Sequence, residues 1–133
     1  MLHPESLYIV LHSQYRAGSY HWGLYYHRAG GTRRPYGRKF HIKNEGTGRW
    51  MADCQDSYGV LRSNFLIGLI RIATIPTSRF DYMKSLIEST PLNTPGITCR
   101  VWVLNAIQSL MDAGLVRSWH WLTRERSTRF RFD

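Results

Sequence analysis

The sequence predicts one α+β domain, residues 1–133, in which an antiparallel sheet packs on an amphipathic helix. Up to about residue 75, short segments alternate polar with apolar residues or are rich in strand-forming types, and glycine-containing or proline-containing turns separate them. From residue 99, apolar residues recur at helical spacing. A length of 133 residues and a hydrophobic share of 43% suit one domain with one core.

The first two expected strands lie near the N-terminus. Leu7–Leu11 is a short apolar run, and the polar stretch His12–Ser19 is expected to end it. His21–His27 alternates two sets of side chains, which a strand would place on opposite faces. One set is His21, Gly23, Tyr25 and His27, and the other is Trp22, Leu24 and Tyr26. The second strand therefore has one face that carries polar side chains.

Three further strands are expected before residue 76. Arg38–Lys43 follows a turn and alternates again, with Phe40 and Ile42 opposite a polar set of Lys39, His41 and Lys43. This strand and the one before it are expected to form a hairpin, which would bring His21 and His41 to the same face. The remaining strands are Trp50–Gln55 and the isoleucine-rich Phe65–Ile75.

Two helices are expected in the last part of the chain. Ser78 followed by Asp81 resembles a capping box, and it predicts a helix that ends near the next proline. Thr98 can cap a second helix, Cys99–Ala113, which Gly114 would end. The apolar stripe of this second helix is Cys99, Trp102, Val103, Ala106, Ile107 and Leu110.

The chain is strongly basic, with 18 Lys and Arg residues against nine Asp and Glu residues and a formal net charge of +9. Residues 28–49 hold seven basic residues and one acidic residue, so much of the charge is concentrated there. This excess predicts an anionic substrate or partner. The basic and aromatic segment 115–133 suits either a nucleic-acid arm or a last strand that covers the core. The residues expected to bind the substrate are Arg33, Arg34, Arg38, Lys39, Lys43 and Trp22.

The two cysteines, Cys54 and Cys99, cannot form the dense disulfide framework of a small secreted domain, and neither stands in a paired-cysteine metal motif. The N-terminal residues lack a signal-peptide pattern, and no apolar run approaches the roughly 18 residues of a membrane span. We therefore expect a soluble cytoplasmic protein that does not contact membranes. Neither a metal site nor a cofactor is expected.

Cys99 is the candidate nucleophile because it would open an apolar helix, and the positive end of a helix lowers the pKa of a thiol. Such a thiol needs a general base that a third polar group orients. His21 and His41 fit this demand, since they lie in the polar sets of adjacent expected strands. The alternative is that Cys99 is a small core residue. The expected oxyanion donors are the Cys99 N–H and the side chain of Gln14.

Three segments carry a family resemblance. HWGLYYH, KFHIKN and TCRVWVLNAI occur in an order that resembles the circularly permuted papain-like thiol enzymes of the lecithin:retinol acyltransferase and PPPDE groups. The resemblance implies a permuted papain-like fold with Cys99 as nucleophile, His21 as general base and His41 as the residue that orients it. Asp53 is an alternative to His41 in this last role. With GRWMADC included, the chain also resembles an uncharacterised family of small fungal proteins over roughly Leu7–Gly114.

The resemblance implies acyl transfer or hydrolysis through a Cys99 thioester. Arg100 stands where the lecithin:retinol acyltransferase group commonly has an acidic residue, which argues against a lipid substrate. The charge favours an RNA-borne acyl donor such as aminoacyl-tRNA. In size, charge and thiol chemistry the chain is similar to fungal arginine-containing cyclodipeptide synthases, which implies a peptide or cyclodipeptide product. The alternatives are a thiol isopeptidase or amidase and, outside enzymes, an RNA-binding module.

Overall fold

A computed structural model of the chain describes residues 2–13, 20–30, 35–44, 46, 48–60 and 66–117. Within these residues, five strands form one antiparallel sheet in the order β4-β3-β2-β1-β5. The expected α+β class with an antiparallel sheet is therefore confirmed. The strands are β1 (Ser6–Ser13), β2 (Tyr20–His27), β3 (Gly37–Lys43), β4 (Met51–Ser57) and β5 (Leu66–Thr74).

The first strand is longer than the sequence predicted. It continues through His12 to Ser13, so the prediction that the polar stretch from His12 ends the strand was wrong. The reason is pairing on both sides: His12 is opposite His21 of β2 and Leu66 of β5. Along β1, the side chains of Leu7, Ile9 and Leu11 join the main core, whereas Tyr8 and Val10 join a second cluster on the other face. His12 continues this second face.

The expected hairpin between β2 and β3 forms, but its two strands pair over only part of their length. The ladder runs from His27 opposite Gly37 to Leu24 opposite Phe40. Beyond Leu24 and Phe40 the two strands continue, yet β2 pairs only with β1 and β3 pairs only with β4. Residues 20–23 of β2 and 41–43 of β3 are therefore not paired with each other, and we call these two strand ends the fork. The fork leaves main-chain groups of β2 available to other partners.

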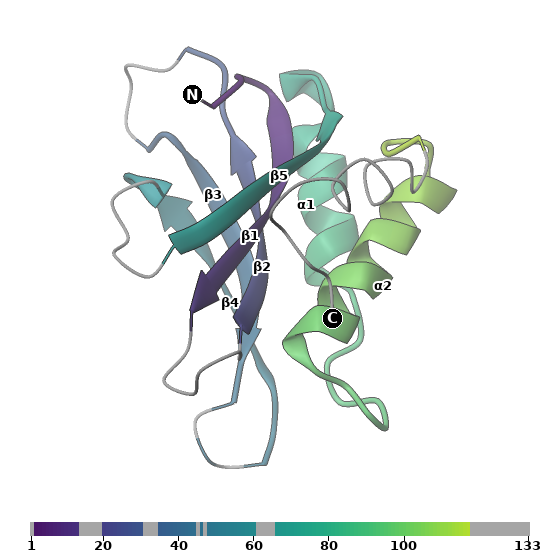
Figure 1. Ribbon diagram of the computed structural model, residues 1–133. Coiled ribbons are helices and arrows are strands. Elements are labelled where there is room, and N and C mark those ends of the chain that lie inside the picture. The colour runs from purple at the N-terminus through teal and green to yellow at the C-terminus, as the bar shows by residue number, and fades with distance from the viewer. Residues whose placement is uncertain are drawn as a thin grey trace, which may run out of the picture.

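Both helices cover the same face of the sheet (Figure 1). They are α1 (Phe80–Glu88) and α2 (Cys99–Asp112), and α2 contacts β2 and β3. The main core lies between the helices and this face of the sheet, and Trp102 is its largest fully buried side chain. None of the described helices is long and apolar enough to cross a membrane.

Helix α2 matches its prediction closely. The Thr98 Oγ1 accepts a hydrogen bond from the Val101 N–H at 3.1 Å, which caps the first turn. After the last turn, Gly114 has a φ of +79°, a left-handed conformation that glycine adopts without strain. All six residues of the predicted apolar stripe are buried. Local sequence therefore determines where this helix begins, where it ends and which face it buries.

The capping box predicted for the first helix does not form. Ser78 lies inside a short 3-10 helix, η2 (Thr77–Arg79), and α1 begins at Phe80 without a side-chain cap. The acceptor in this region comes from a distant residue, because the Glu5 carboxylate takes hydrogen bonds from the Thr77 N–H at 2.6 Å and its hydroxyl at 2.9 Å. A tertiary contact has replaced the local cap.

Candidate active site

The Cys99 thiol lies at the fork of the sheet. Cys99 is the first residue of α2, its exposed fraction is 8%, and its Sγ accepts a hydrogen bond from the Trp22 N–H at 3.4 Å. That amide belongs to the part of β2 that does not pair with β3. The helix N-terminus thus holds the thiol against the main chain of β2, one residue beyond His21. Both cysteines are free thiols.

His21 and His41 meet across the fork, as their alternation predicted. The Nε2 of His21 lies 2.9 Å from the Nδ1 of His41, and the two rings are nearly perpendicular. Gly23 makes room for this contact, because a Cβ at that position would lie 3.2 Å from the His41 Cβ and from the Phe40 carbonyl oxygen. The glycine of the HWG segment is therefore part of the site's construction.

Asp53 extends the histidine pair. It lies opposite His41 in the pairing of β3 with β4, and its Oδ2 is 3.0 Å from the His41 Nε2. The Nζ of Lys43 is 3.9 Å from the same oxygen. The sequence offered His41 and Asp53 as alternatives for orienting His21. In the structure they act in series: Asp53 holds His41, and His41 holds His21.

Both histidines of the pair are neutral near pH 7. Burial, followed by electrostatic interaction with His41 and Lys39, lowers the pKa of His21 from 6.5 to about 4. Burial also lowers the pKa of His41, against the opposing effect of Asp53, whose charge and hydrogen bond raise it. A neutral imidazole can take up a proton, so His21 is available as a general base near pH 7, and its lowered pKa makes it a weaker base than an ordinary histidine.

The hydrogen bonds determine which nitrogen of each neutral ring carries its proton. The Asp53 carboxylate can only accept, so His41 donates from Nε2 and its Nδ1 is unprotonated. That Nδ1 must then accept from the Nε2–H of His21. We therefore assign the unprotonated nitrogen of His21 to Nδ1, the ring nitrogen nearer its main chain.

The thiol and the His21 ring do not touch directly. Within the described residues, the hydrogen-bond partner of the Cys99 Sγ is the Trp22 amide and that of His21 is His41. Alternation along β2 places Trp22 in the core between sheet and helices, whereas His21 lines a cavity with Val10 on the open face. Cys99 and His21 are therefore neighbours at the fork, one reaching it from each face of the sheet.

A cavity of about 240 Å³ opens on the helix-free face beside the histidine pair. The sequence missed one of its residues, His12, because the expected first strand stopped at Leu11. The alternation of Tyr8, Val10 and His12 was the signal that identifies it. Burial lowers the pKa of His12, and the charges of Lys39 and His21 add to this effect. The lining residues are Val10, His12, His21, Gly23, Leu24, Lys39, Phe40 and His41.

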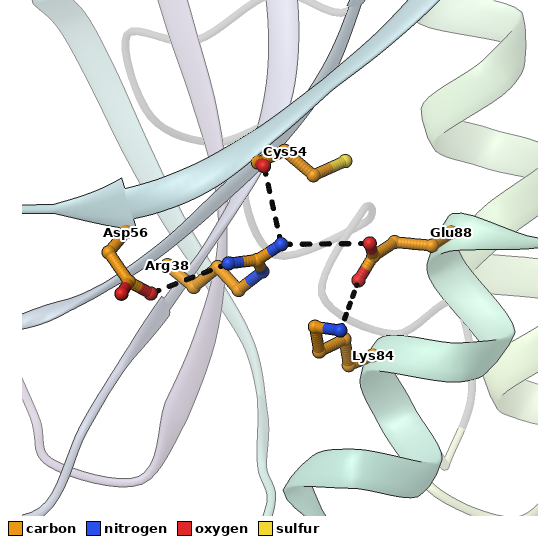
Figure 2. Close-up of polar contacts among 5 residues, drawn as sticks. All are labelled: Arg38, Cys54, Asp56, Lys84 and Glu88. Atoms are coloured by element: carbon orange, nitrogen blue, oxygen red, sulfur yellow. Dashed lines mark hydrogen bonds and ion pairs between the residues drawn. The ribbon is translucent and has the colours of Figure 1, made fainter.

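Two residues expected to bind substrate have other roles. Trp22 is 3% exposed and belongs to the core, with the Arg100 guanidinium over its ring at 5.7 Å. Arg38 is 17% exposed and bridges the sheet to α1: its guanidinium lies 3.4 Å from Asp56 and 3.6 Å from Glu88, as Figure 2 shows. Neither side chain lines the cavity, because even-numbered residues of β2 and β3 face the helices.

Other residues of the predicted site divide between two groups. Lys39 lines the cavity, and Lys43 pairs with Asp53 at the end of β3. Gln14, Arg33, Arg34 and residues 118–133 lie outside the described residues. In the part of the chain that the structure describes, no group of three or more His, Cys, Asp or Glu side chains is arranged to hold a metal ion.

Comparisons with known proteins place the chain in a family without naming its activity. The model of DUF6914, a family of unknown function, matches residues 5–128. No curated protein and no solved structure matches the chain.

Proposed function

We propose that this chain, which belongs to the DUF6914 family of unknown function, is a permuted papain-like thiol enzyme that transfers or hydrolyses an acyl group through Cys99. One observation carries the proposal: the Cys99 thiol sits on the amide that directly follows His21, and His21 is already held by His41 and Asp53. Covalent catalysis requires a nucleophile, a base and a group that orients the base; here the base and its orienting groups are hydrogen-bonded in sequence, and the thiol lies beside them on the next main-chain amide.

In the first step the thiol forms a thioester. The Nδ1 of His21 takes the proton of the Cys99 thiol, and the sulfur attacks the carbonyl carbon of the acyl donor. The carbonyl π electrons move to oxygen and form an oxyanion. When the C=O bond re-forms, the bond to the leaving group breaks, and His21 gives the proton to the departing alcohol or amine.

In the second step the thioester is consumed. An amine acceptor, or water in hydrolysis, attacks the thioester carbonyl while His21 removes a proton from it. Collapse of the second tetrahedral intermediate releases the product and the Cys99 thiolate, which recovers the proton from His21. Through both steps the hydrogen bond to His41 keeps the proton of neutral His21 on Nε2 and leaves Nδ1 unprotonated, and Asp53 stabilises the charge that develops on the two rings.

The oxyanion needs hydrogen-bond donors near the thiol. The first N–H groups of a helix have no acceptor within the helix, and the N–H of Cys99 itself is one of them. The second donor in this proposal is the side chain of Gln14, in the segment that follows β1. The positive end of α2 favours negative charge at the same place.

The donor proposed for this reaction is an RNA-borne acyl group, as in aminoacyl-tRNA, and the net charge of +9 supports it. Total tRNA should bind at low salt, and changing Arg33, Arg34 and Lys39 to Glu should reduce the slope of log affinity against log salt by about 0.7 to 0.9 for each lost phosphate contact. If the parent protein does not bind tRNA, the isopeptidase or amidase alternative replaces this donor.

Trapping the thioester tests the enzyme proposal itself. After incubation with aminoacyl-tRNA or simple activated esters, intact-mass spectrometry should show an acyl adduct that maps to Cys99 and that neutral hydroxylamine removes. The Cys99→Ala variant should give no adduct, and Cys54→Ala should give the parent result. An adduct on Cys54 alone, or none on any cysteine, would contradict the assignment and favour an RNA-binding module.

A further inference from the structure

Lys39 is a cation that the acyl-transfer steps leave unused. It lies in the polar set of β3 with His41, on the sheet face opposite the helices, and its side chain is half-buried. None of the described acidic residues forms an ion pair with it. Arg38, the next residue along the strand, contacts Asp56 and Glu88 instead. Among the described residues, therefore, no acidic side chain compensates the positive charge that Lys39 carries into the cavity.

The other residues that line the cavity also favour a negatively charged ligand. Its lining contains three imidazoles and no acidic side chain, while Val10 provides an apolar wall. The charge of Lys39 lowers the pKa of His12, His21 and His41, so its ammonium group lies within electrostatic reach of all three rings. The His12 side chain makes no hydrogen bond to any described residue, which leaves its ring nitrogens available to a ligand.

We propose that this cavity is the substrate's anion site, in which the Lys39 ammonium and the His12 ring bind a carboxylate or phosphate group of the acyl substrate. The inference rests on the proposed function, because His21 lines the cavity and also adjoins the Cys99 thiol at the fork. A substrate carboxylate or phosphate group held by Lys39 on the open face would position the rest of the substrate beside His21. Lys39 is then a specificity residue and His12 its partner.

Two alkylating reagents of similar size test this charge preference directly. Iodoacetate carries a carboxylate and iodoacetamide does not, so the ratio of their rates at Cys99 reports an attractive charge near the thiol. We expect Lys39→Met to lower the ratio of iodoacetate to iodoacetamide rates about three- to tenfold, because it removes the positive charge that concentrates anions in the cavity beside His21. Lys39→Arg keeps the charge and should keep most of the preference.

Lys84→Met is the matched control. It removes the same charge from α1, across the sheet from the cavity, where Lys84 pairs with Glu88 at 3.2 Å. Its rate ratio should equal that of the parent. If Lys39→Met and Lys84→Met give the same ratio while iodoacetamide still modifies Cys99 selectively, the anion site is refuted and the proposed function stands. If neither reagent modifies Cys99 faster than Cys54, both proposals fail.

Protection by small anions then identifies which anionic group the cavity takes. Inorganic phosphate and acetate are added separately during alkylation by iodoacetamide at constant ionic strength. Protection by phosphate assigns the site to a phosphate of an RNA-borne donor, and protection by acetate assigns it to the carboxylate of a free acyl substrate. Either protection should be weaker in Lys39→Met and His12→Phe. Absence of protection by both anions at millimolar concentration overturns the inference.

Discussion

The Nε2 of His21 and the Nδ1 of His41 lie 2.9 Å apart across two strands that no longer pair at that point. This contact uses the outer nitrogen of His21 and leaves the inner one toward the main chain. The next amide along the chain, that of Trp22, holds the thiol of Cys99. The chemistry proposed for the chain depends on this one contact, and the following predictions test its parts.

The two cysteines should differ strongly in reactivity. Burial and the negative charge of Glu88 raise the pKa of the Cys54 thiol, whereas Cys99 lies at the N-terminus of α2. With iodoacetamide at pH 7, peptide mapping should find Cys99 modified first. Cys99→Ala should abolish turnover without unfolding the protein, and Cys54→Ala should leave turnover largely intact. Equal activity of the two variants would remove the nucleophile from the proposal.

The two histidines should contribute unequally to the rate. His21 exchanges a proton in both steps, so His21→Ala should lose roughly 100- to 10,000-fold in rate. His41→Asn can still offer an oxygen to the Nε2–H of His21 and should retain much more activity than His21→Asn. Substitution of His21 should also shift the pH midpoint of Cys99 alkylation more than substitution of His41. A greater loss in His41→Asn than in His21→Asn would mean that the two roles are exchanged.

Asp53 should determine the tautomers of the histidine pair. In ¹⁵N NMR spectra at pH 7, both rings should be neutral and carry their proton on Nε2, because Asp53 accepts from His41 and His41 accepts from His21. Asp53→Ala removes the acceptor that selects this state, so Nδ1–H signals should appear. Asp56→Ala, three residues further along the same strand, is the control and should leave the tautomers unchanged.

The stability of the fold should fall in mild acid. The unfolded chain protonates a histidine near 6.5, but the folded protein protonates His21 only near its pKa of about 4. Acid therefore favours unfolding, and the contribution of neutral His21 to stability is lost as the pH falls from about 6.5 to about 4. Urea midpoints measured across this range should decrease, and His21→Gln should show a smaller decrease. A midpoint that rises in acid would contradict the pKa direction.

Arg38 should matter for stability and not for substrate affinity. Its guanidinium also donates to the Cys54 carbonyl at 3.2 Å and lies over the Phe40 ring. Arg38→Met should therefore lower the free energy of unfolding by about 1–3 kcal/mol, as expected for hydrogen bonds to charged groups. Arg79→Met, at an exposed position, should cost less. The two variants should bind tRNA equally; a larger loss of tRNA affinity in Arg38→Met would restore Arg38 as a binding residue.

The features that the sequence predicted well are those that neighbouring residues determine. Thr98, the apolar stripe of α2 and Gly114 define the second helix, and alternation along two strands was enough to bring His21 and His41 together. The features that it missed depend on distant contacts. His12 belongs to the site because β1 extends through it by pairing with strands on both sides. The short helix η2 precedes α1 because the distant Glu5 carboxylate accepts a hydrogen bond from the Thr77 N–H. The assignment of Arg38 to substrate binding was made from charge alone, without regard to which strand face it occupies.

The strand order has a consequence for synthesis on the ribosome. β1 lies between β2 and β5, so the N-terminal strand has one unpaired edge until residues 66–74 have been made. The two histidines belong to β2 and β3, whereas the Cys99 thiol arrives with α2, later still. A nascent chain thus acquires both histidines before its proposed nucleophile, and a product truncated before residue 99 contains His21 and His41 without the Cys99 thiol.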